Sequence, residues 1–535
     1  MRFVSAMKLH FSRIAMLVAC HACIPALPSP VNDIIDGEKD AQSDTEPGPI
    51  PFVQDGVGAA WRDHAGDFIA EPGRWHFSRV FDGRFNVLVI ASEGHDRVGS
   101  VLWSMPLVDI LSALPKNTHL IFASNDLDAA EKAETKQQEL FSWLEKLTPE
   151  DARDVFSRIH VIDAKSTTKD DWMGSVVYAH GPGVFMISRA QELRSVANVM
   201  TSSGPDLAAL ARELVALNRE AEDQQALRNL DAFSVDVFKM HPHLGGWGDG
   251  ANSFAEIILP SNEVLEHANR VHVELLLACE GRDEGTCPAW DRTVQLFVCD
   301  PLEPNTCEHE IARWISPYHR EGWWLTDISS MLPLMHSGGP VRFRLLHHNG
   351  QPISVRLHFS NDGSSKRPIG IQKLWRGGVF NADYNQGREA IALKAPEGAT
   401  SAQLAVLVTG HGFGKDTLNC AEFCNHTHYF GMGTSTWGKR HPEAGSSDGC
   451  LIRVAEGVVP NQWGTWYYGR GGWCPGQDVG WWTVDVPMVG EMTYEGGVND
   501  QAYVPVLNNN VAPNAFDSNI EMTSYIVYYE GKWSF

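Results

Sequence analysis

The sequence predicts an α/β segment followed by β-sandwiches, so the chain as a whole is expected to be mainly β. Residues 52–230 alternate short apolar runs with helical stretches, which is the layer pattern of α/β folds. From Asp231 onward the helical periodicity stops, and short alternating runs separated by Gly, Pro, Asn and Asp take over. A length of 535 residues is enough for about three domains.

Four short apolar runs in the α/β segment predict buried parallel strands. They are residues 85–91, 120–123, 159–162 and 184–187. Helices are expected over 129–147 and 205–230, and Pro149 is placed to open a further helix. Because residues 52–230 lack cysteine and follow a tether, we expect them to form a separate accessory domain.

The remaining part predicts two sandwiches. Clear strand patterns occupy residues 271–277, 293–298, 341–345 and 354–359. A polar break near residues 364–368 divides this part into a first sandwich over 231–366 and a second over 367–535.

The first 26 residues have the features of an export signal. A basic start, which contains Arg2, Lys8 and Arg13, precedes an apolar stretch over 14–27 that is too short to span a bilayer. Cleavage near Ala26 would release a secreted protein.

A lipid anchor is the alternative at the same end. Residues 17–20 resemble a bacterial lipobox with Cys20 as the lipidated residue. Residues 27–51 are acidic and proline-containing with few apolar side chains, which indicates a linker. Both alternatives place the protein outside the cytoplasm, either secreted or on the cell envelope.

The charge excludes several classes of partner. A net charge of −23 argues against nucleic acids and anionic membranes, because these ligands attract basic surfaces. No stretch beyond the signal region reaches the roughly 18 apolar residues of a membrane-spanning helix. The 18 tryptophans cluster in the C-terminal half, where they serve either as sugar platforms or as core residues.

Eight cysteines lie beyond the signal region, and an even set in an exported chain implies disulfides. They are Cys279, Cys287, Cys299, Cys307, Cys420, Cys424, Cys450 and Cys474. The sequence alone does not determine their pairing. A zinc site would need paired spacings such as CxxC, which are missing.

Five short motifs follow one another in the sandwich part: CPAWDR at 287–292, TGHGFG at 409–414, CAEFC at 420–424, GTW at 464–466 and RGGWCPG at 470–476. In this order and at these spacings they resemble the peptide-N-glycosidase F family, over about residues 231–535. The α/β segment has no counterpart in that resemblance.

The resemblance implies two eight-stranded antiparallel jelly rolls packed side by side, with the site at their interface. It implies hydrolysis of the bond between an asparagine side-chain nitrogen and the first N-acetylglucosamine, without cofactor or metal. N-glycosylated proteins or glycopeptides would be the partners, and a monomer is expected. It also implies the disulfides Cys279–Cys287, Cys420–Cys424 and Cys450–Cys474, and we pair the extra Cys299 with Cys307.

The resemblance assigns the chemistry to two carboxylates. Asp291 matches the principal acid–base residue, and Glu422 matches a second site carboxylate. Substrate contacts are assigned to Arg292, Arg470, Trp473, Trp290 and Phe423. No Ser-His-Asp or Cys-His nucleophile pattern stands out, so a carboxylate-driven mechanism is expected.

One departure keeps two other functions open. The family carries a third carboxylate that would fall on Arg344 or Leu346, and no acid occurs from 341 to 358. The first alternative is therefore a non-catalytic glycan- or protein-binding relative. The second is a copper monooxygenase, whose candidate ligands would be His347, His348, His426, His428 and Met432. Neighbouring strand residues such as His347 and His348 point to opposite faces, which disfavours copper.

Overall fold

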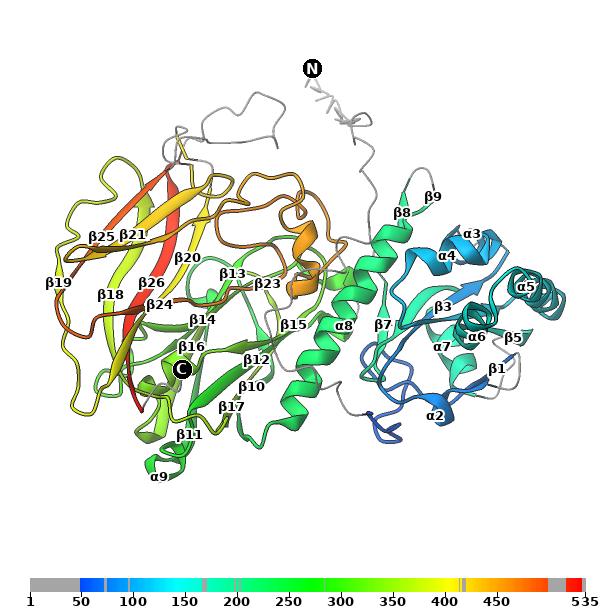
Figure 1. The fold of residues 1–535 in the computed structure, drawn as a ribbon, viewed down its shortest axis with the longest axis horizontal. Helices are drawn as coiled ribbons and strands as arrows, with labels where there is room; N and C mark the ends of the chain where they lie inside the picture. Colours follow the sequence, from blue (N-terminus) through cyan, green and yellow to red (C-terminus); the bar gives the residue numbers. More distant parts are fainter. Residues whose placement is uncertain are drawn as a thin grey trace, which may run out of the picture. The chain divides into compact units, whose positions relative to one another are not determined.

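The computed structural model describes most of the chain from residue 49 onward (Figure 1). The described ranges are 49–71, 75–94, 97–165, 171–196, 199–201, 204–282, 284–412, 414–415, 420–498 and 516–531. The expected signal sequence, Cys20 and most of the expected linker lie outside these ranges. The described residues belong to one compact unit. No helix among them is long and apolar enough to cross a membrane.

The α/β part is built on a sheet with the strand order β5–β4–β3–β6–β7. In that order the strands are Ile159–Lys165, Thr118–Ser124, Asn86–Ser92, Gly183–Ile187 and Leu193–Ser195. β3, β4 and β5 are parallel as predicted, but β6 is antiparallel to β3, which corrects the expected fourth parallel strand. An apolar run indicates burial on both faces and does not reveal strand direction. β6 also pairs antiparallel with the edge strand β7.

Helices pack against this sheet (Figure 1). They are α3 (Arg97–Ser104), α4 (Leu107–Ala113), α5 (Ala129–Leu144), α6 (Pro149–Arg158), α7 (Trp172–His180) and α8 (Leu207–Asn229). α5 and α8 confirm the two helices expected from periodicity. Pro149 opens α6, where the Thr148 hydroxyl accepts a hydrogen bond from the Asp151 amide at 3.2 Å. The short elements are β1 (Ile69–Ala70), β2 (Trp75–His76), α2 (Phe77–Val80), β8 (Met200–Thr201) and β9 (Gly204–Pro205).

The first sandwich has the strand order of a jelly roll. One sheet runs β10–β17–β12–β15 and the other runs β11–β16–β13–β14–β23. The strands are β10 (Phe233–His243), β11 (Asn252–Ser261), β12 (Arg270–Leu277), β13 (Thr293–Val298), β14 (His309–Ile315), β15 (Gly322–Asp327), β16 (Gly338–His347) and β17 (Gln351–Ser360). All neighbours are antiparallel. The helical turns are η2 (Asp249–Ala251), α9 (Asn262–Leu265), η3 (Glu280–Arg282), η4 (Glu284–Thr286) and η5 (Ser329–Leu334).

The second sandwich repeats this order. Its sheets run β18–β26–β20–β24 and β19–β25–β21–β22, again antiparallel. The strands are β18 (Arg367–Phe380), β19 (Ile391–Ala392), β20 (Ser401–His411), β21 (His426–Met432), β22 (Ser435–Lys439), β24 (Trp482–Val486), β25 (Glu491–Val498) and β26 (Ser518–Glu530). η6 (Leu451–Glu456) and β23 (Gln477–Asp478) lie between β22 and β24. The expected pair of jelly rolls after an α/β part is confirmed.

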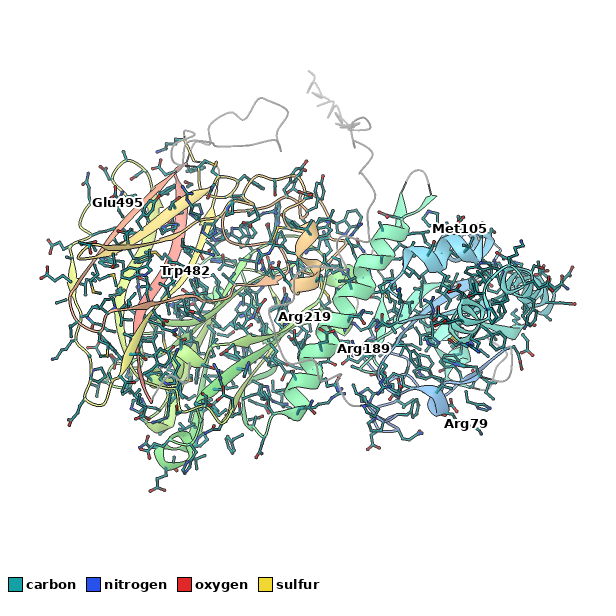
Figure 2. All side chains as sticks on the ribbon, viewed as in Figure 1. Arg79, Met105, Arg189, Arg219, Trp482 and Glu495 are labelled. Carbon is teal, nitrogen blue, oxygen red and sulfur yellow. A yellow bond between two sulfur atoms is a disulfide. The ribbon has the colours of Figure 1, made fainter. Side chains whose placement is uncertain are left out.

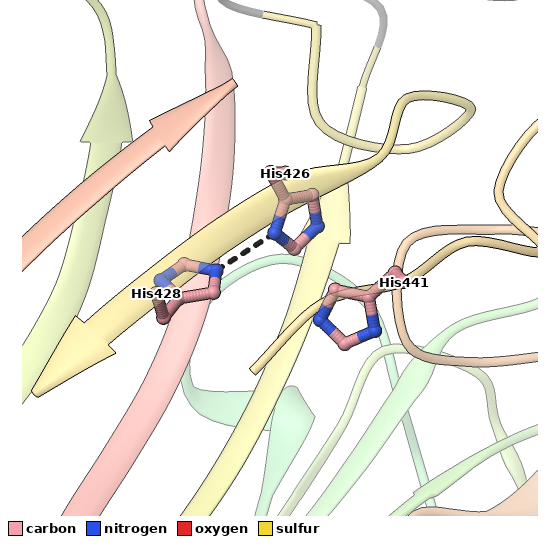
Figure 3. Close-up of side chains that lie close together, drawn as sticks. All are labelled: His426, His428 and His441. Carbon is pink, nitrogen blue, oxygen red and sulfur yellow. Dashed lines mark hydrogen bonds between the residues drawn. The ribbon is translucent and has the colours of Figure 1, made fainter. Parts of the chain in front are cut away.

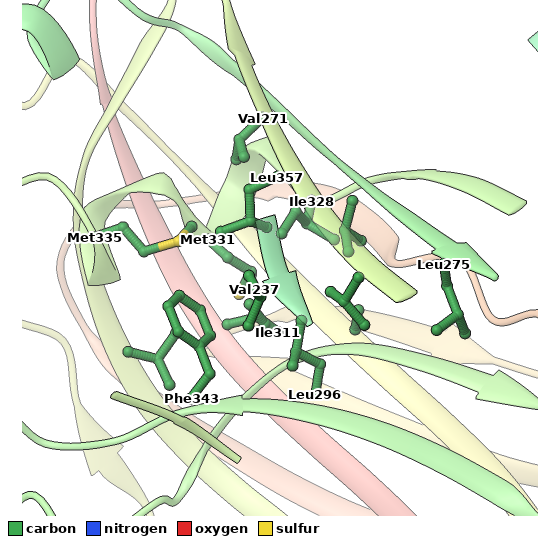
Figure 4. Close-up of a cluster of buried hydrophobic side chains, with 14 of the residues drawn as sticks. Val237, Val271, Leu275, Leu296, Ile311, Ile328, Met331, Met335, Phe343 and Leu357 are labelled. Carbon is green, nitrogen blue, oxygen red and sulfur yellow. The ribbon is translucent and has the colours of Figure 1, made fainter. Parts of the chain in front are cut away.

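The core of the first roll extends into the second. Strand residues with period two, such as Val271 and Leu275, face inward and are fully buried (Figure 4). The same apolar cluster includes Tyr525 and Val527 of β26, so the two rolls share buried surface. This shared core fixes the position of the two rolls relative to each other.

Helix α8 joins the α/β part to the jelly rolls. It contacts β3 and α4, and also β15 and η6. Glu213 on α8 forms a buried ion pair with Arg320 at 2.5 Å, and Arg62 pairs with Glu321 at 2.8 Å. Figure 2 marks α8 by Arg219 among the side chains of this region. That residues 52–230 fold independently of the jelly rolls therefore stays a proposal. Its test is whether the jelly rolls stay folded without these ion pairs.

Removal of the residues before Asp231 should destabilise the jelly rolls. Arg320 would lose Glu213 but keep its pair with Glu284 at 3.0 Å, while the surface of β15 and η6 that α8 covers would be exposed to water, so the free energy of unfolding should fall. A chain that begins at Gly204 keeps α8 and should lose less stability. Calorimetric unfolding of both truncated chains tests this, and equal stability to the full chain would show that the rolls do not need α8.

Candidate active site

The loop before β13 carries Asp291 and is fixed at both ends. The disulfide Cys279–Cys287 closes its start. The Trp290 carbonyl accepts hydrogen bonds from Asn349 Nδ2 at 2.6 Å and from the Ser316 hydroxyl at 2.9 Å. The backbone on the N-terminal side of Asp291 is therefore held by two other segments of the first roll.

Glu422 comes from the second roll, in the loop closed by Cys420–Cys424. Its Oε2 accepts a hydrogen bond from the Gly412 amide at 3.1 Å, and its carbonyl accepts from the Gly471 amide at 2.5 Å. A Cβ on Gly471 would lie 2.3 Å from the Ala421 carbonyl oxygen, so only glycine permits this approach. The glycines of the sequence motifs thus bring two loops into contact around Glu422.

Arg470 connects the two carboxylates. Its Nη2 lies 3.5 Å from Asp291 Oδ2 and its Nε lies 3.4 Å from Glu422 Oε1. Its side chain is 1% exposed, and Nη1 donates to the Tyr468 carbonyl at 2.9 Å. Arg470 was expected to bind substrate, but its burial instead makes it the cation that holds both acids.

Two aromatic rings enclose this guanidinium. The Arg470 guanidinium carbon lies 4.9 Å from the Trp473 ring centre and 5.1 Å from the Phe423 ring centre. Trp473 and Phe423 are only 3% and 2% exposed, and the Trp473 indole donates to the Gly410 carbonyl at 2.7 Å. Both residues were expected to contact the substrate, and their burial against Arg470 leaves neither ring with an open face for a sugar.

The electrostatic environment favours protonation of both acids. Burial raises the pKa of Asp291, while the nearby Arg470 works in the opposite direction. Burial also raises the pKa of Glu422, with Arg470 again opposing and Asp291 adding to the rise. Burial and the nearby Asp291 raise the pKa of the Tyr318 phenol, whose oxygen lies 3.5 Å from Arg470 Nη2. Such shifts are typical of acid–base sites.

Exposed tryptophans lie on segments that are linked to the Asp291 loop through Arg292 and His319. Trp290, next to Asp291, is 61% exposed, and Trp247 is 79% exposed. The Arg292 guanidinium lies 5.6 Å and 5.5 Å from these two rings, respectively. Trp463, which is 57% exposed, meets His319 edge-on. These residues form an aromatic rim that sugars can stack on.

The sequence analysis missed several members of this site. Tyr318 lies within the range of the family resemblance, but none of the five motifs contains it. Trp247 and Trp463 stand in glycine-rich loop sequence, where an exposed aromatic residue was the available signal. Trp290 and Arg292 were named and do lie in the rim.

The four expected disulfides are present. The pairs are Cys279–Cys287, Cys299–Cys307, Cys420–Cys424 and Cys450–Cys474. Two of them flank Glu422 and the Arg470 loop, respectively, so they stabilise the local geometry of the acid pair.

The position of the missing third acid needs correction. Arg344 lies 4.2 Å from the Phe297 ring centre and is influenced by Glu308 and Glu310, not by Asp291. Leu346 packs against the cluster formed by Phe297 and the Cys299–Cys307 pair. Placing an acid at either position would not restore a third carboxylate beside the other two.

A different acid approaches the site through a histidine. Glu521 on β26 lies 3.9 Å from His411 Nε2. The His411 ring is stacked on the Trp473 ring. Burial lowers the pKa of His411, and the negative charge of Asp291 opposes this effect in part.

The ligand set considered for copper does not form. His347 is fully buried beside His243, whereas His348 stacks on the exposed Trp247, so the two neighbours do point to opposite faces. Among the described residues, the histidines close enough to share a metal are His426, His428 and His441.

One comparison with known protein families gives a match, and it lies within the second roll. A family model described as "Peptide-N-glycosidase F, C terminal" matches residues 380–527. This range contains Glu422 and Arg470, whereas Asp291 precedes it. A search of curated proteins finds no match.

The solved structures that are similar include PNGase F, a glycosylasparaginase from Flavobacterium meningosepticum, at 17% identity over 56% of this chain and 97% of that chain, with a TM-score of 0.44. PNGF-II is similar at 14% identity over 59% of this chain and 68% of that chain, with a TM-score of 0.41. Residues 380–527, within the second jelly roll, are thus similar to the C-terminal domain of the peptide-N-glycosidase F family.

Proposed function

We propose that the protein is an amidase that cleaves the bond between an asparagine side-chain nitrogen and the first N-acetylglucosamine of an N-linked glycan. The observation that supports this most directly is the acid pair. Asp291 and Glu422 come from different rolls, and one buried guanidinium, Arg470, lies within 3.5 Å of both. The family whose model matches the second roll carries the name of such an activity.

The two acids have separate roles in the proposed reaction. Asp291 accepts a proton from water, and the water oxygen attacks the amide carbon. Glu422, whose pKa is raised, gives a proton to the leaving nitrogen as the carbon–nitrogen bond breaks. One water is consumed, and the products are an aspartate side chain and a glycosylamine. Arg470 keeps the acids in place and does not touch the substrate.

The aromatic rim would bind the sugar. Trp290 and Trp463 offer open ring faces beside the acids, and Arg292 supplies hydrogen-bond donors between Trp290 and Trp247. The four disulfides fit an oxidising compartment, so we place the activity outside the cytoplasm. N-glycosylated proteins or glycopeptides are then the partners.

Incubation with a denatured high-mannose glycoprotein tests the activity. Mass spectrometry should show aspartate in place of the glycosylated asparagine, together with a released glycan. Glycan binding without release would favour the non-catalytic relative, which the exposed tryptophans also support.

Trp290→Ala should weaken substrate binding and leave chemistry nearly intact. Loss of one stacking platform raises KM about tenfold, which corresponds to about 1.4 kcal/mol, with little change in kcat. Trp143→Ala, in α5 and outside the rim, is the control and should leave both constants unchanged. A fall in kcat without a change in KM would place Trp290 in the chemical step.

A further inference from the structure

Three histidines converge inside the second roll, outside the acid pair (Figure 3). His426 and His428 lie on β21, and His441 lies two residues beyond the end of β22. One ring nitrogen from each histidine lies within 4.8 Å of the others. His426 and His428 are fully buried and His441 is 4% exposed.

The fold explains why these three meet. His426 and His428 are two residues apart on a strand, so their side chains share a face. β22 pairs with β21, and Lys439 at the end of β22 lies opposite His428. The chain that follows β22 therefore runs beside the face of β21 that carries His426 and His428. Asn425 Oδ1 accepts a hydrogen bond from the His441 amide at 2.9 Å and fixes that passage.

The inward nitrogens have the character of metal ligands. His426 Nδ1 and His428 Nε2 lie 2.7 Å apart, and His441 Nε2 is buried without a hydrogen-bond partner. His428 Nδ1 lies 2.7 Å from the Tyr494 hydroxyl, which is itself 2.9 Å from the Tyr384 hydroxyl. An outer hydrogen bond of this kind orients a ligating imidazole and leaves its inner nitrogen free of a proton.

We propose that His426, His428 and His441 bind one divalent transition-metal ion of the class that prefers imidazole nitrogen, namely Zn²⁺ or Cu²⁺. Metal–nitrogen bonds of about 2.0–2.1 Å place tetrahedral ligands roughly 3.3 Å apart, so His441 must approach and the other two rings must separate slightly.

This site differs from the expectations drawn from the sequence. Those expectations included no metal, and the copper alternative combined His426 and His428 with Met432. The spacing H-x-H-x₁₂-H contains the three ligands, but nothing in the sequence alone shows that His441 returns to β21.

The ion would brace the loops that carry the acid pair. A Cβ on Gly471 would lie 2.4 Å from His426 Nε2, so the His426 ring packs directly on the backbone next to Arg470. His426 also follows Cys424 by two residues and thus anchors the end of the Glu422 loop. The role is structural, because none of the three rings belongs to the acid pair or the aromatic rim.

Metal content and stability test the proposal in the full chain, purified without a histidine tag. After chelation and dialysis, calorimetric titration with Zn²⁺ alone, and separately with Cu²⁺, should show one bound ion per chain and a higher thermal midpoint. Co²⁺ should give the visible absorption bands of a site with nitrogen ligands.

Histidine variants distinguish this site from non-specific binding of metal ions to exposed histidines. His441→Ala should abolish stoichiometric binding, and His426→Gln should do the same, whereas the exposed His336→Ala should bind as the wild type does. If folded wild-type protein binds neither Zn²⁺ nor Cu²⁺, or if His441→Ala binds unchanged, the site does not exist. These readouts do not depend on amidase activity, so they stand apart from the proposed function.

Discussion

Asp291→Asn loses about 100-fold or more in kcat, which is the range expected when a general base is removed. Asparagine keeps the shape of the side chain and its contact with Arg470, but it cannot accept a proton from water. The wild-type rate should fall as the pH drops through the apparent pKa of the acid pair, which burial raises above the ordinary value for aspartate. Kinetics on a defined glycopeptide between acidic and neutral pH measure both effects.

Stability provides the control for this variant. Since folding raises the pKa of Asp291, ionisation of the carboxylate costs stability as the pH rises through that pKa. Asparagine does not ionise and Glu422 still pairs with Arg470, so Asp291→Asn should lower the thermal midpoint at neutral pH by less than Arg470→Met does. A variant that folds normally and keeps the wild-type rate would remove Asp291 from the mechanism.

Arg470→Met has the largest expected effect on stability. Methionine fills much of the space between Phe423 and Trp473, but Asp291 and Glu422 lose their shared cation. Removing one partner from a buried charge cluster costs about 3–5 kcal/mol. The pKa values of both acids should rise further, so the acid limb of the pH–rate profile moves to higher pH.

Arg292→Met is the matched control. Arg292 contacts the exposed rings of Trp290 and Trp247 and is not enclosed by the acid pair. Its replacement should cost about 1 kcal/mol of stability or less and leave the pH–rate profile in place. If Arg470→Met unfolds at the same denaturant concentration as Arg292→Met, the guanidinium does not hold the site together.

The fold was predictable because its signals are local. Period-two apolar runs, such as that of β12, and the helical spacing of α8 report burial directly. The direction of β6 was not predictable, since strand direction depends on which neighbour the strand pairs with. The disulfides followed from the family resemblance and from the pairing of the two remaining cysteines with each other.

The site was predictable only in part, because the exposure of a side chain in this site depends on how several loops pack together, which a local motif does not show. The motifs identified Asp291 and Glu422, and the structure brings both to Arg470. The same motifs could not show that Trp473 and Phe423 are buried against Arg470 while Trp290 stays exposed. His441 lies 15 residues from His426 in a different loop, and only the hairpin brings them together.

The short strand β23 affects how the first roll is protected from aggregation while the chain is synthesised and folds. It belongs by sequence to the second roll, yet Asp478 and Gln477 pair with Trp314 and Ile315 at the end of β14. β14 is the last strand of its sheet apart from β23, and exposed edge strands with apolar residues are templates for aggregation. The first roll, once synthesised, keeps this edge open until residue 478 has emerged from the ribosome. The second roll thus acts as a cap on the first, and a ribosome that stalls before that point would leave an aggregation-prone fragment.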